Sequence, residues 1–121
     1  MDSKVVEEYS SKVDVLSQTL IKLVLMSLGF ETFSKYYNSV FEKSCKGNLR
    51  MNYYSPPNNS NQSSSSIALK PHTDFSCLTL LYNDHIRGLE VQSKEGSWFS
   101  VEPLADSFSV NLGDVFQVCE R

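Results

Sequence analysis

The spacing of apolar residues changes at Gly47, and this change constrains the fold more than any other feature of the sequence. Before Gly47, apolar residues recur at steps of three and four, which is the spacing of one helix face. After Gly47, short apolar runs are separated by turn-forming residues, which indicates β-strands. Helices followed by short strands predict an α+β fold in which the helices pack outside a sheet.

The first helix is predicted over residues 6–23, and Gly29 supplies its stop signal. A coiled-coil seam is the alternative interpretation, but sustained heptads need a longer run. We therefore expect this apolar face to lie on a sheet or core. Its members are Val6, Tyr9, Val13, Leu16, Leu20 and Leu23.

A second helix is predicted between Thr32, which can cap its start, and Gly47, which can end it. Its aromatic stripe is interpreted as core rather than as a stacking platform. The stripe consists of Phe33, Tyr36, Tyr37, Val40 and Phe41.

Strands are predicted in the rest of the chain. "LRMNYYS", which starts at Leu49, alternates as a strand does, and the polar low-complexity stretch 56–66 is expected to be a flexible surface loop. "CLTLLY" is predicted as a buried strand, "NDHIRG" as a turn and "LEVQ" as the returning strand, with "SWFSV", "SFSVNL" and "VFQV" following. Gly88 and Gly113 are expected in turns with positive φ, and Trp98 and Phe108 in the sheet core.

Composition excludes several classes of protein. The 121 residues are 40% hydrophobic, which allows one small packed domain, and the net charge of -3 argues against a general nucleic-acid binder. No apolar run is long enough to span a bilayer. The N-terminal "MDSKVVEEYS" is unlike a signal peptide, and the three cysteines form no CxxC pair, so a cytoplasmic location is predicted.

An H-x-D pair, His72 and Asp74, precedes the "CLTLLY" strand. On an extended segment, residues i and i+2 face the same side, so one imidazole nitrogen and one carboxylate oxygen can meet a single divalent ion. Two ligands alone do not make a site, and a solvated polar pair is the common alternative. His85, the other histidine, is interpreted as an exposed turn residue, and Asp114 as a turn former.

Five motifs occur in a fixed order: "MNYYSPP", "KPHTDFSCLTLLY", "GLEV", "WFSVEP" and "SVNLGD". In this order the sequence resembles the plant 2-oxoglutarate- and Fe(II)-dependent dioxygenases of the isopenicillin N synthase-like superfamily, with a gibberellin-oxidase-like group among its candidates. The resemblance extends from about Tyr9 to Val118 and is densest after Leu49.

The resemblance implies a partial double-stranded β-helix, or jelly roll, with two N-terminal helices packed against it. Residues 1–47 would form a helical buttress. Residues 48–121 would form an incomplete dioxygenase core that carries the flexible loop 56–66.

The resemblance also implies the site. His72 and Asp74 match iron ligands, and Asn52 and Tyr54 match the residues that help hold 2-oxoglutarate. An amide and a phenol can both donate hydrogen bonds to a dicarboxylate. The implied cofactors are Fe(II), 2-oxoglutarate as cosubstrate and ascorbate, and the implied substrate is a small organic metabolite or plant hormone.

The family's second iron-binding histidine and its R-x-S motif have no match in this sequence. We therefore expect a chain truncated at both ends that turns over little by itself. A non-catalytic fragment that associates through exposed strand edges is the alternative function. A cupin-like protein that binds another metal ion is a third possibility.

Overall fold

The computed structural model describes residues 2–29, 47–54 and 67–119. The chain divides into two compact units, Met1–His72 and Thr73–Arg121.

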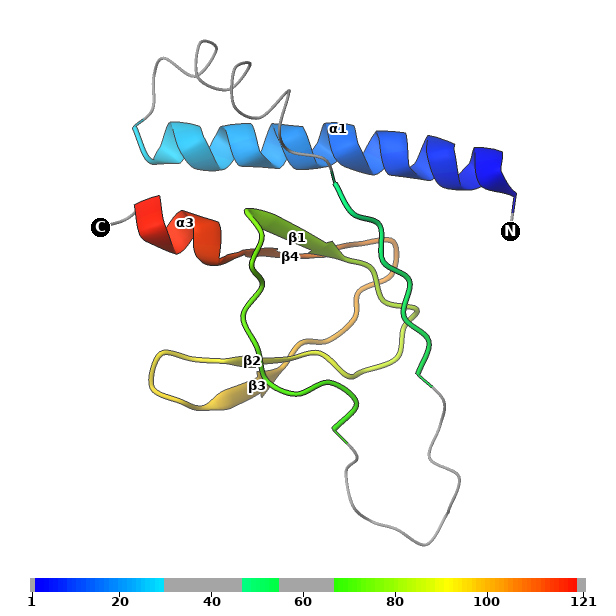
Figure 1. Cartoon of the computed structure of the whole chain (residues 1–121). Helices are drawn as coiled ribbons and strands as arrows, with labels where there is room; N and C mark the ends of the chain where they lie inside the picture. The colour runs from blue at the N-terminus through cyan, green and yellow to red at the C-terminus, as the bar shows by residue number, and fades with distance from the viewer. Residues whose placement is uncertain (1, 30–46, 55–66, 120–121) are drawn as a thin grey trace, which may run out of the picture. The chain divides into compact units, whose positions relative to one another are not determined.

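In the first unit, helix α1 spans Ser3–Ser27 (Figure 1) and contains the whole helix predicted over residues 6–23. Asp2 caps its start, because the side-chain Oδ1 accepts a hydrogen bond from the backbone N–H of Lys4 at 3.1 Å. At the other end, the N–H of Gly29 donates to the carbonyl of Met26 at 3.1 Å, and Gly29 has a φ of 83°. The predicted stop signal at Gly29 is therefore confirmed, since a left-handed residue after the last turn favours glycine.

The apolar face of α1 differs from the predicted stripe. Ile21 is the buried side chain of the helix, at 8% exposure, whereas Tyr9, Leu16 and Leu23 are 42%, 38% and 57% exposed. The less exposed face also includes two serines, which a pattern based on apolar residues does not detect. That face consists of Val6, Ser10, Val13, Ser17, Leu20, Ile21, Val24 and Leu25.

Residues 47–54 do not form a strand, so the strand predicted for "LRMNYYS" is wrong for the part that the structure describes. All eight residues are exposed, and alternation without a hydrogen-bonded neighbour does not make a strand. The second predicted helix and the predicted loop 56–66 lie outside the described residues.

In the second unit, β1 (Leu78–Leu81) pairs antiparallel with β4 (Ser109–Leu112), so that Leu78 lies opposite Leu112. The two strands lie side by side in Figure 1. "LEVQ" is therefore not the strand that returns beside "CLTLLY", as the sequence had predicted. The sequence order of short strands does not fix which of them pair.

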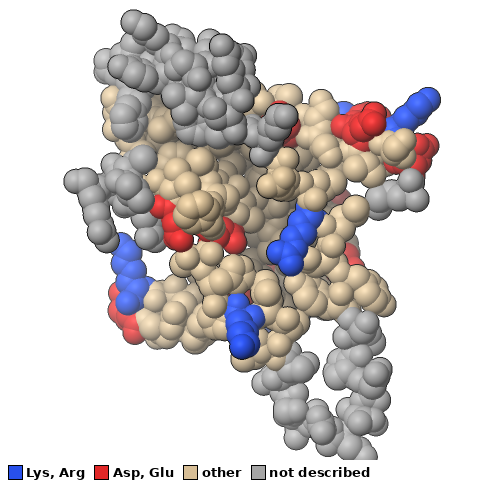
Figure 2. All heavy atoms as spheres, viewed as in Figure 1, with Lys and Arg blue, Asp and Glu red and all other residues tan. Residues whose placement is uncertain are grey.

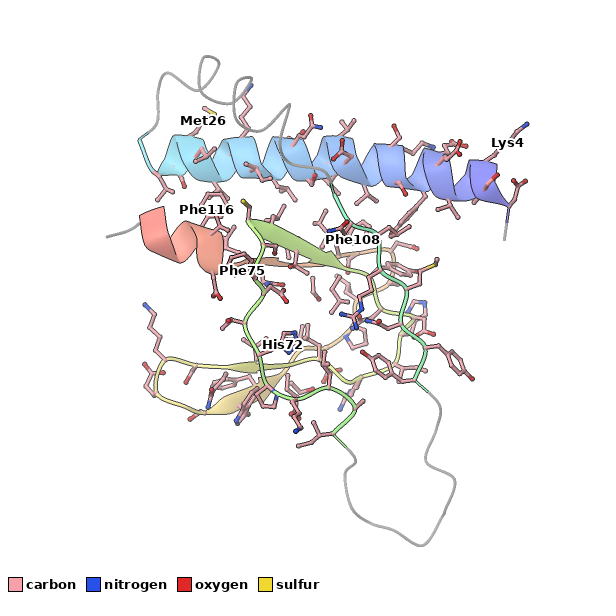
Figure 3. All side chains as sticks on the ribbon, in the orientation of Figure 1. Lys4, Met26, His72, Phe75, Phe108 and Phe116 are labelled. Atoms are coloured by element: carbon pink, nitrogen blue, oxygen red, sulfur yellow. The ribbon has the colours of Figure 1, made fainter. Side chains whose placement is uncertain are left out.

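Beyond the last paired rung, the rings of Tyr82 and Phe108 meet edge to face with centroids 6.0 Å apart. Figure 3 shows Phe108 and Phe116 at opposite ends of β4. Phe108, which the sequence predicted in the sheet core, is half-buried and is not among the buried hydrophobic residues of the described structure.

β2 (Glu90–Gln92) and β3 (Trp98–Ser100) form a separate antiparallel hairpin. Its turn is closed by the N–H of Ser93, which donates to the carbonyl of Ser97 at 2.8 Å, and it contains Gly96 at a φ of 89°. Every residue of β2 and β3 is exposed, and Trp98 retains 48% exposure. The prediction that Trp98 lies in the sheet core is therefore wrong for the described structure.

The chain after β4 is helical, because α3 spans Asp114–Cys119. The strand predicted for "VFQV" is wrong. The N–H of Phe116 donates to the carbonyl of Gly113 at 3.1 Å, and Phe116 is 5% exposed. An apolar run as short as this does not distinguish a strand from a buried helical turn.

The predicted role of two glycines is also wrong. Gly88 and Gly113 are not among the residues with positive φ. Gly113 is instead required by a close approach of two backbone segments, since a Cβ there would lie 2.1 Å from the carbonyl oxygen of Ser76 and 2.6 Å from that of Asp74.

Two surface properties bear on partners. None of the helices in the described ranges has the length and hydropathy needed to cross a bilayer. On the face in Figure 2, Lys and Arg side chains stand singly between other residues, so the described part of that face has no continuous basic surface.

Candidate functional site

The segment before β1 carries the predicted metal ligands. His72, the last residue of the first unit, is exposed, and its Nδ1 lies 2.9 Å from the carbonyl oxygen of Lys70. A carbonyl oxygen only accepts hydrogen bonds, so Nδ1 is the donor in this contact, and in the neutral imidazole the lone pair is then on Nε2. Metal-binding histidines commonly have this arrangement, with the second ring nitrogen held by a carbonyl or carboxylate.

Asp74 lies in the second unit and is half-buried. Its Oδ2 accepts a hydrogen bond from Nδ2 of Asn111 at 3.0 Å. Asn111 belongs to β4, where it lies opposite Thr79. A carboxylate that binds a metal is in turn usually hydrogen-bonded by a neighbouring side chain, and Asn111 supplies that partner.

The residues after Asn111 hold the backbone around Asp74. The N–H of Asp114 donates to the carbonyl of Asp74 at 2.8 Å, and the N–H of Gly113 donates to the carbonyl of Cys77 at 3.1 Å. The hydroxyl of Thr73 donates to Oδ2 of Asp114 at 2.8 Å. Asp114 was interpreted from the sequence as a turn former, but it starts α3 and binds the H-x-D segment.

The two residues predicted to hold 2-oxoglutarate lie in the exposed segment 47–54. Asn52 and Tyr54 are both exposed, and Tyr54 retains 56% of its surface. They belong to the first unit, as His72 does, whereas Asp74 belongs to the second. Their roles stay predictions.

His85 is exposed in a bend between β1 and β2, as predicted, and has a φ of 67°. Within residues 2–29, 47–54 and 67–119, no group of three or more His, Cys, Asp or Glu side chains could hold a metal ion. The described residues therefore supply at most two of the three ligands in a 2-His-1-carboxylate iron site.

Sequence reasoning missed Asn111, although a signal was present. A strand whose other residues include Val110 and Leu112 carries one amide side chain, beside the turn that "NLGD" predicts. An amide side chain between two apolar neighbours can donate a hydrogen bond. The sequence does not identify the acceptor, because Asp74 lies 37 residues away along the chain.

His72 and Asp74 each have a supporting hydrogen bond, and their coordination of a metal stays a prediction. Comparison with known families is more specific. Residues 45–121 match the family model described as the 2OG-Fe(II) oxygenase superfamily. The chain belongs to this superfamily, and the resemblance inferred from the sequence motifs is thereby confirmed.

Among the similar proteins is a "Gibberellin 20-oxidase-like protein" of Arabidopsis thaliana, 32% identical over 121 residues. "Gibberellin 2-beta-dioxygenase 7" of the same plant is 35% identical over 113 residues, and "Thebaine 6-O-demethylase" of Papaver somniferum is 34% identical over 115. These alignments cover 93% of this chain and 37%, 32% and 30% of the respective relatives. The chain thus spans about a third of the length of the curated relatives it matches. No solved structure matches it significantly.

Proposed function

We propose that the chain is the iron-binding part of a 2-oxoglutarate-dependent oxidoreductase that oxidises or hydroxylates a small plant metabolite of the hormone class. The observation that carries the proposal is the supported H-x-D pair: Lys70 binds Nδ1 of His72, and Asn111 binds Oδ2 of Asp74. The family match and the gibberellin oxidases among the relatives support the substrate class.

His72 and Asp74 are the proposed ligands of the iron. The Nδ1 contact keeps the imidazole in the tautomer whose Nε2 lone pair can coordinate a metal. The carboxylate of Asp74 would lower the net charge of a divalent ion and fix its position. When bound, Fe(II) with 2-oxoglutarate supplies the oxygen activation for the oxidation of the substrate.

Asn52 and Tyr54 are the proposed contacts of 2-oxoglutarate. The amide and the phenol can donate to its carboxylates, and both side chains are exposed in the structure. Ascorbate is the proposed reductant that maintains the ferrous state.

The paired strands would belong to a jelly roll, with α1 in the buttress segment 1–47 and the core at 48–121. The family match, which begins at residue 45, supports this division. The two β pairs are not closed into a roll within the described residues.

Little turnover is proposed for the 121-residue chain by itself. The sequence contains two histidines, and His85 lies in an exposed bend. A two-ligand site should hold Fe(II) weakly, because each absent ligand removes direct coordination.

Metal binding by the purified chain tests the proposal. Co(II) is a suitable probe because it is paramagnetic and stable in air, and its effect on NMR resonances can be assigned residue by residue. We expect Co(II) to perturb His72 and Asp74, and His72→Ala to abolish this effect. His85→Ala is the matched control and should leave it unchanged. Perturbation that survives His72→Ala would exclude the proposed ligands.

Turnover is measured separately with Fe(II), 2-oxoglutarate and ascorbate in air. We expect succinate production to be no higher than in the His72→Ala variant. Clear succinate production above that level would refute the proposed inactivity of the isolated chain and would support the family chemistry.

Association is the second candidate function, and the exposed strands favour it. Within the described residues each sheet has only two strands, and Val91, Trp98 and Phe99 are each about half exposed or more. Exposed edges and apolar side chains promote pairing with another chain. Sedimentation of the chain over a concentration series distinguishes a monomer from an associating fragment.

A further inference from the structure

The position of Asn111 is fixed by the pairing of β4 with β1. It faces Thr79 across the β1–β4 pair, with Val110 opposite Leu80 and Leu112 opposite Leu78 on either side. An antiparallel ladder fixes the position of each Cβ relative to the neighbouring strand. The amide of Asn111 is therefore presented from a regular strand and not from a loop.

In the contact between Asn111 and Asp74, only one assignment of donor and acceptor is possible. An ionised carboxylate only accepts hydrogen bonds, so the Nδ2 group of Asn111 must be the donor to Oδ2 of Asp74. A hydrogen bond to a charged acceptor is stronger than one between neutral groups. The bond restricts rotation of the carboxylate about χ1 and χ2, because rotation away from the observed rotamer would break it.

The main chain of Asp74 is held by the same short segment of sequence. Asp114 donates its N–H to the carbonyl of Asp74, and Gly113 approaches so closely that a Cβ would lie 2.6 Å from that oxygen. Residues 111–114 therefore hold both the backbone and the carboxylate of Asp74.

From these contacts we propose that Asn111 is a positioning residue, which holds the carboxylate of Asp74 in the orientation that binds the metal ion. The inference rests on the proposed function, since it assigns Asn111 a role at that site. It makes Asn111 part of the support of the site and not a ligand. An outer hydrogen-bond partner of this kind changes metal affinity by about tenfold to a hundredfold.

The first test needs no metal. In the wild-type chain, three-bond couplings should report one χ1 rotamer for Asp74. In Asn111→Ala the couplings should shift away from the wild-type values, because the donor that favours the observed rotamer is removed. Ser109→Ala is the matched control, since Ser109 lies two residues earlier on the same face of β4 and should leave the couplings unchanged. Equal couplings in the wild type and in Asn111→Ala would overturn the inference.

The second test is a Co(II) titration of the same variants, followed at the resonances of residues 72–74. Asn111→Ala should raise the dissociation constant about tenfold to a hundredfold, and Ser109→Ala should not change it. An unchanged constant in Asn111→Ala would overturn the inference even if wild-type binding is observed. If Co(II) leaves the wild-type residues unperturbed, the proposed metal function fails, and the couplings still decide whether Asn111 orients Asp74.

The isosteric variant Asn111→Asp covers the case in which Asn111→Ala does not fold. It keeps the shape of the side chain but replaces the donor with a second carboxylate, which repels Asp74. The amides of β1, the strand that pairs with β4, report folding in the same spectra. A folded Asn111→Asp variant in which Asp74 keeps the wild-type rotamer would contradict the inference.

Discussion

The two strand pairs of the second unit are stabilised in different ways. β1 and β4 come from distant parts of the sequence, every residue of β1 is half-buried, and Asn111 of β4 contacts Asp74. β2 and β3 are neighbours in sequence, are exposed at every residue, and are joined by one tight turn. The first pair depends on the close approach of backbone segments, and the second on local turn chemistry. The candidate metal ligand Asp74 is associated with the pair that is harder to form.

The largest effect is expected for Gly113→Ala, which should disrupt the β1–β4 pair. The added Cβ would lie 2.1 Å from the carbonyl oxygen of Ser76, so the backbone must move. We expect a loss of about 3 kcal/mol in the free energy of unfolding. Urea unfolding and amide exchange of β1 and β4 measure it. Gly88→Ala is the control, because nothing lies within 4 Å of its added Cβ; equal effects of the two variants would refute the close-approach explanation.

Gly96→Ala should affect the β2–β3 hairpin and spare β1–β4. Gly96 has a φ of 89°, which costs an L-residue about 1 kcal/mol or more. Amide exchange should accelerate in the hairpin alone. If exchange accelerates equally in both pairs, they are not independently stabilised and the comparison above is wrong.

Phe108→Leu should weaken β1–β4 by about 1 kcal/mol, because it removes the edge-to-face contact with Tyr82. A double-mutant cycle with Tyr82→Leu isolates the energy of the pair. Phe99→Leu is the control, since Phe99 is 59% exposed in the hairpin and should have little effect. A coupling energy of zero would show that the contact between the two rings does not stabilise the β1–β4 pair.

The smallest effect concerns the charge in the hairpin turn. The hydroxyl of Ser93 donates to the carboxylate of Glu95 and lowers the pKa of Glu95 below its ordinary value. A lowered folded-state pKa stabilises the fold above the ordinary pKa, and this stabilisation is lost as the pH falls through the folded value. The contribution is small because Glu95 is fully exposed. Ser93→Ala should raise the pKa in an NMR titration, whereas Ser107→Ala should not.

The sequence predicted the local features of the fold and missed those that depend on distant residues. The stop at Gly29, the strand around Leu78–Leu81 and the turn before Trp98 were correct, because capping, apolar runs and turn residues act within a few positions. The pairing of β1 with β4 was missed because it joins separated segments. The helix at Asp114 was missed because a short apolar run fits either state.

In the candidate site, too, the sequence predicted the local motif and missed the residue that depends on a distant contact. His72 and Asp74 were identified from a three-residue motif and an ordered set of neighbouring motifs, and the family to which they point is confirmed. Their coordination of a metal stays a prediction. Asn111 was not identified, because its partner is distant in sequence and only the folded strand brings the two side chains together.

The β2–β3 hairpin is enclosed within the stretch of chain that connects β1 to β4. A hairpin of neighbouring strands forms within microseconds, whereas pairing of remote strands must first close a long loop. Once formed, the hairpin shortens the effective loop between Leu81 and Ser109 and so reduces the closure entropy, by about 0.6 kcal/mol for each halving. We therefore expect the hairpin to form early during folding, and pulse-labelled exchange that protects β1 before β2 would contradict this order.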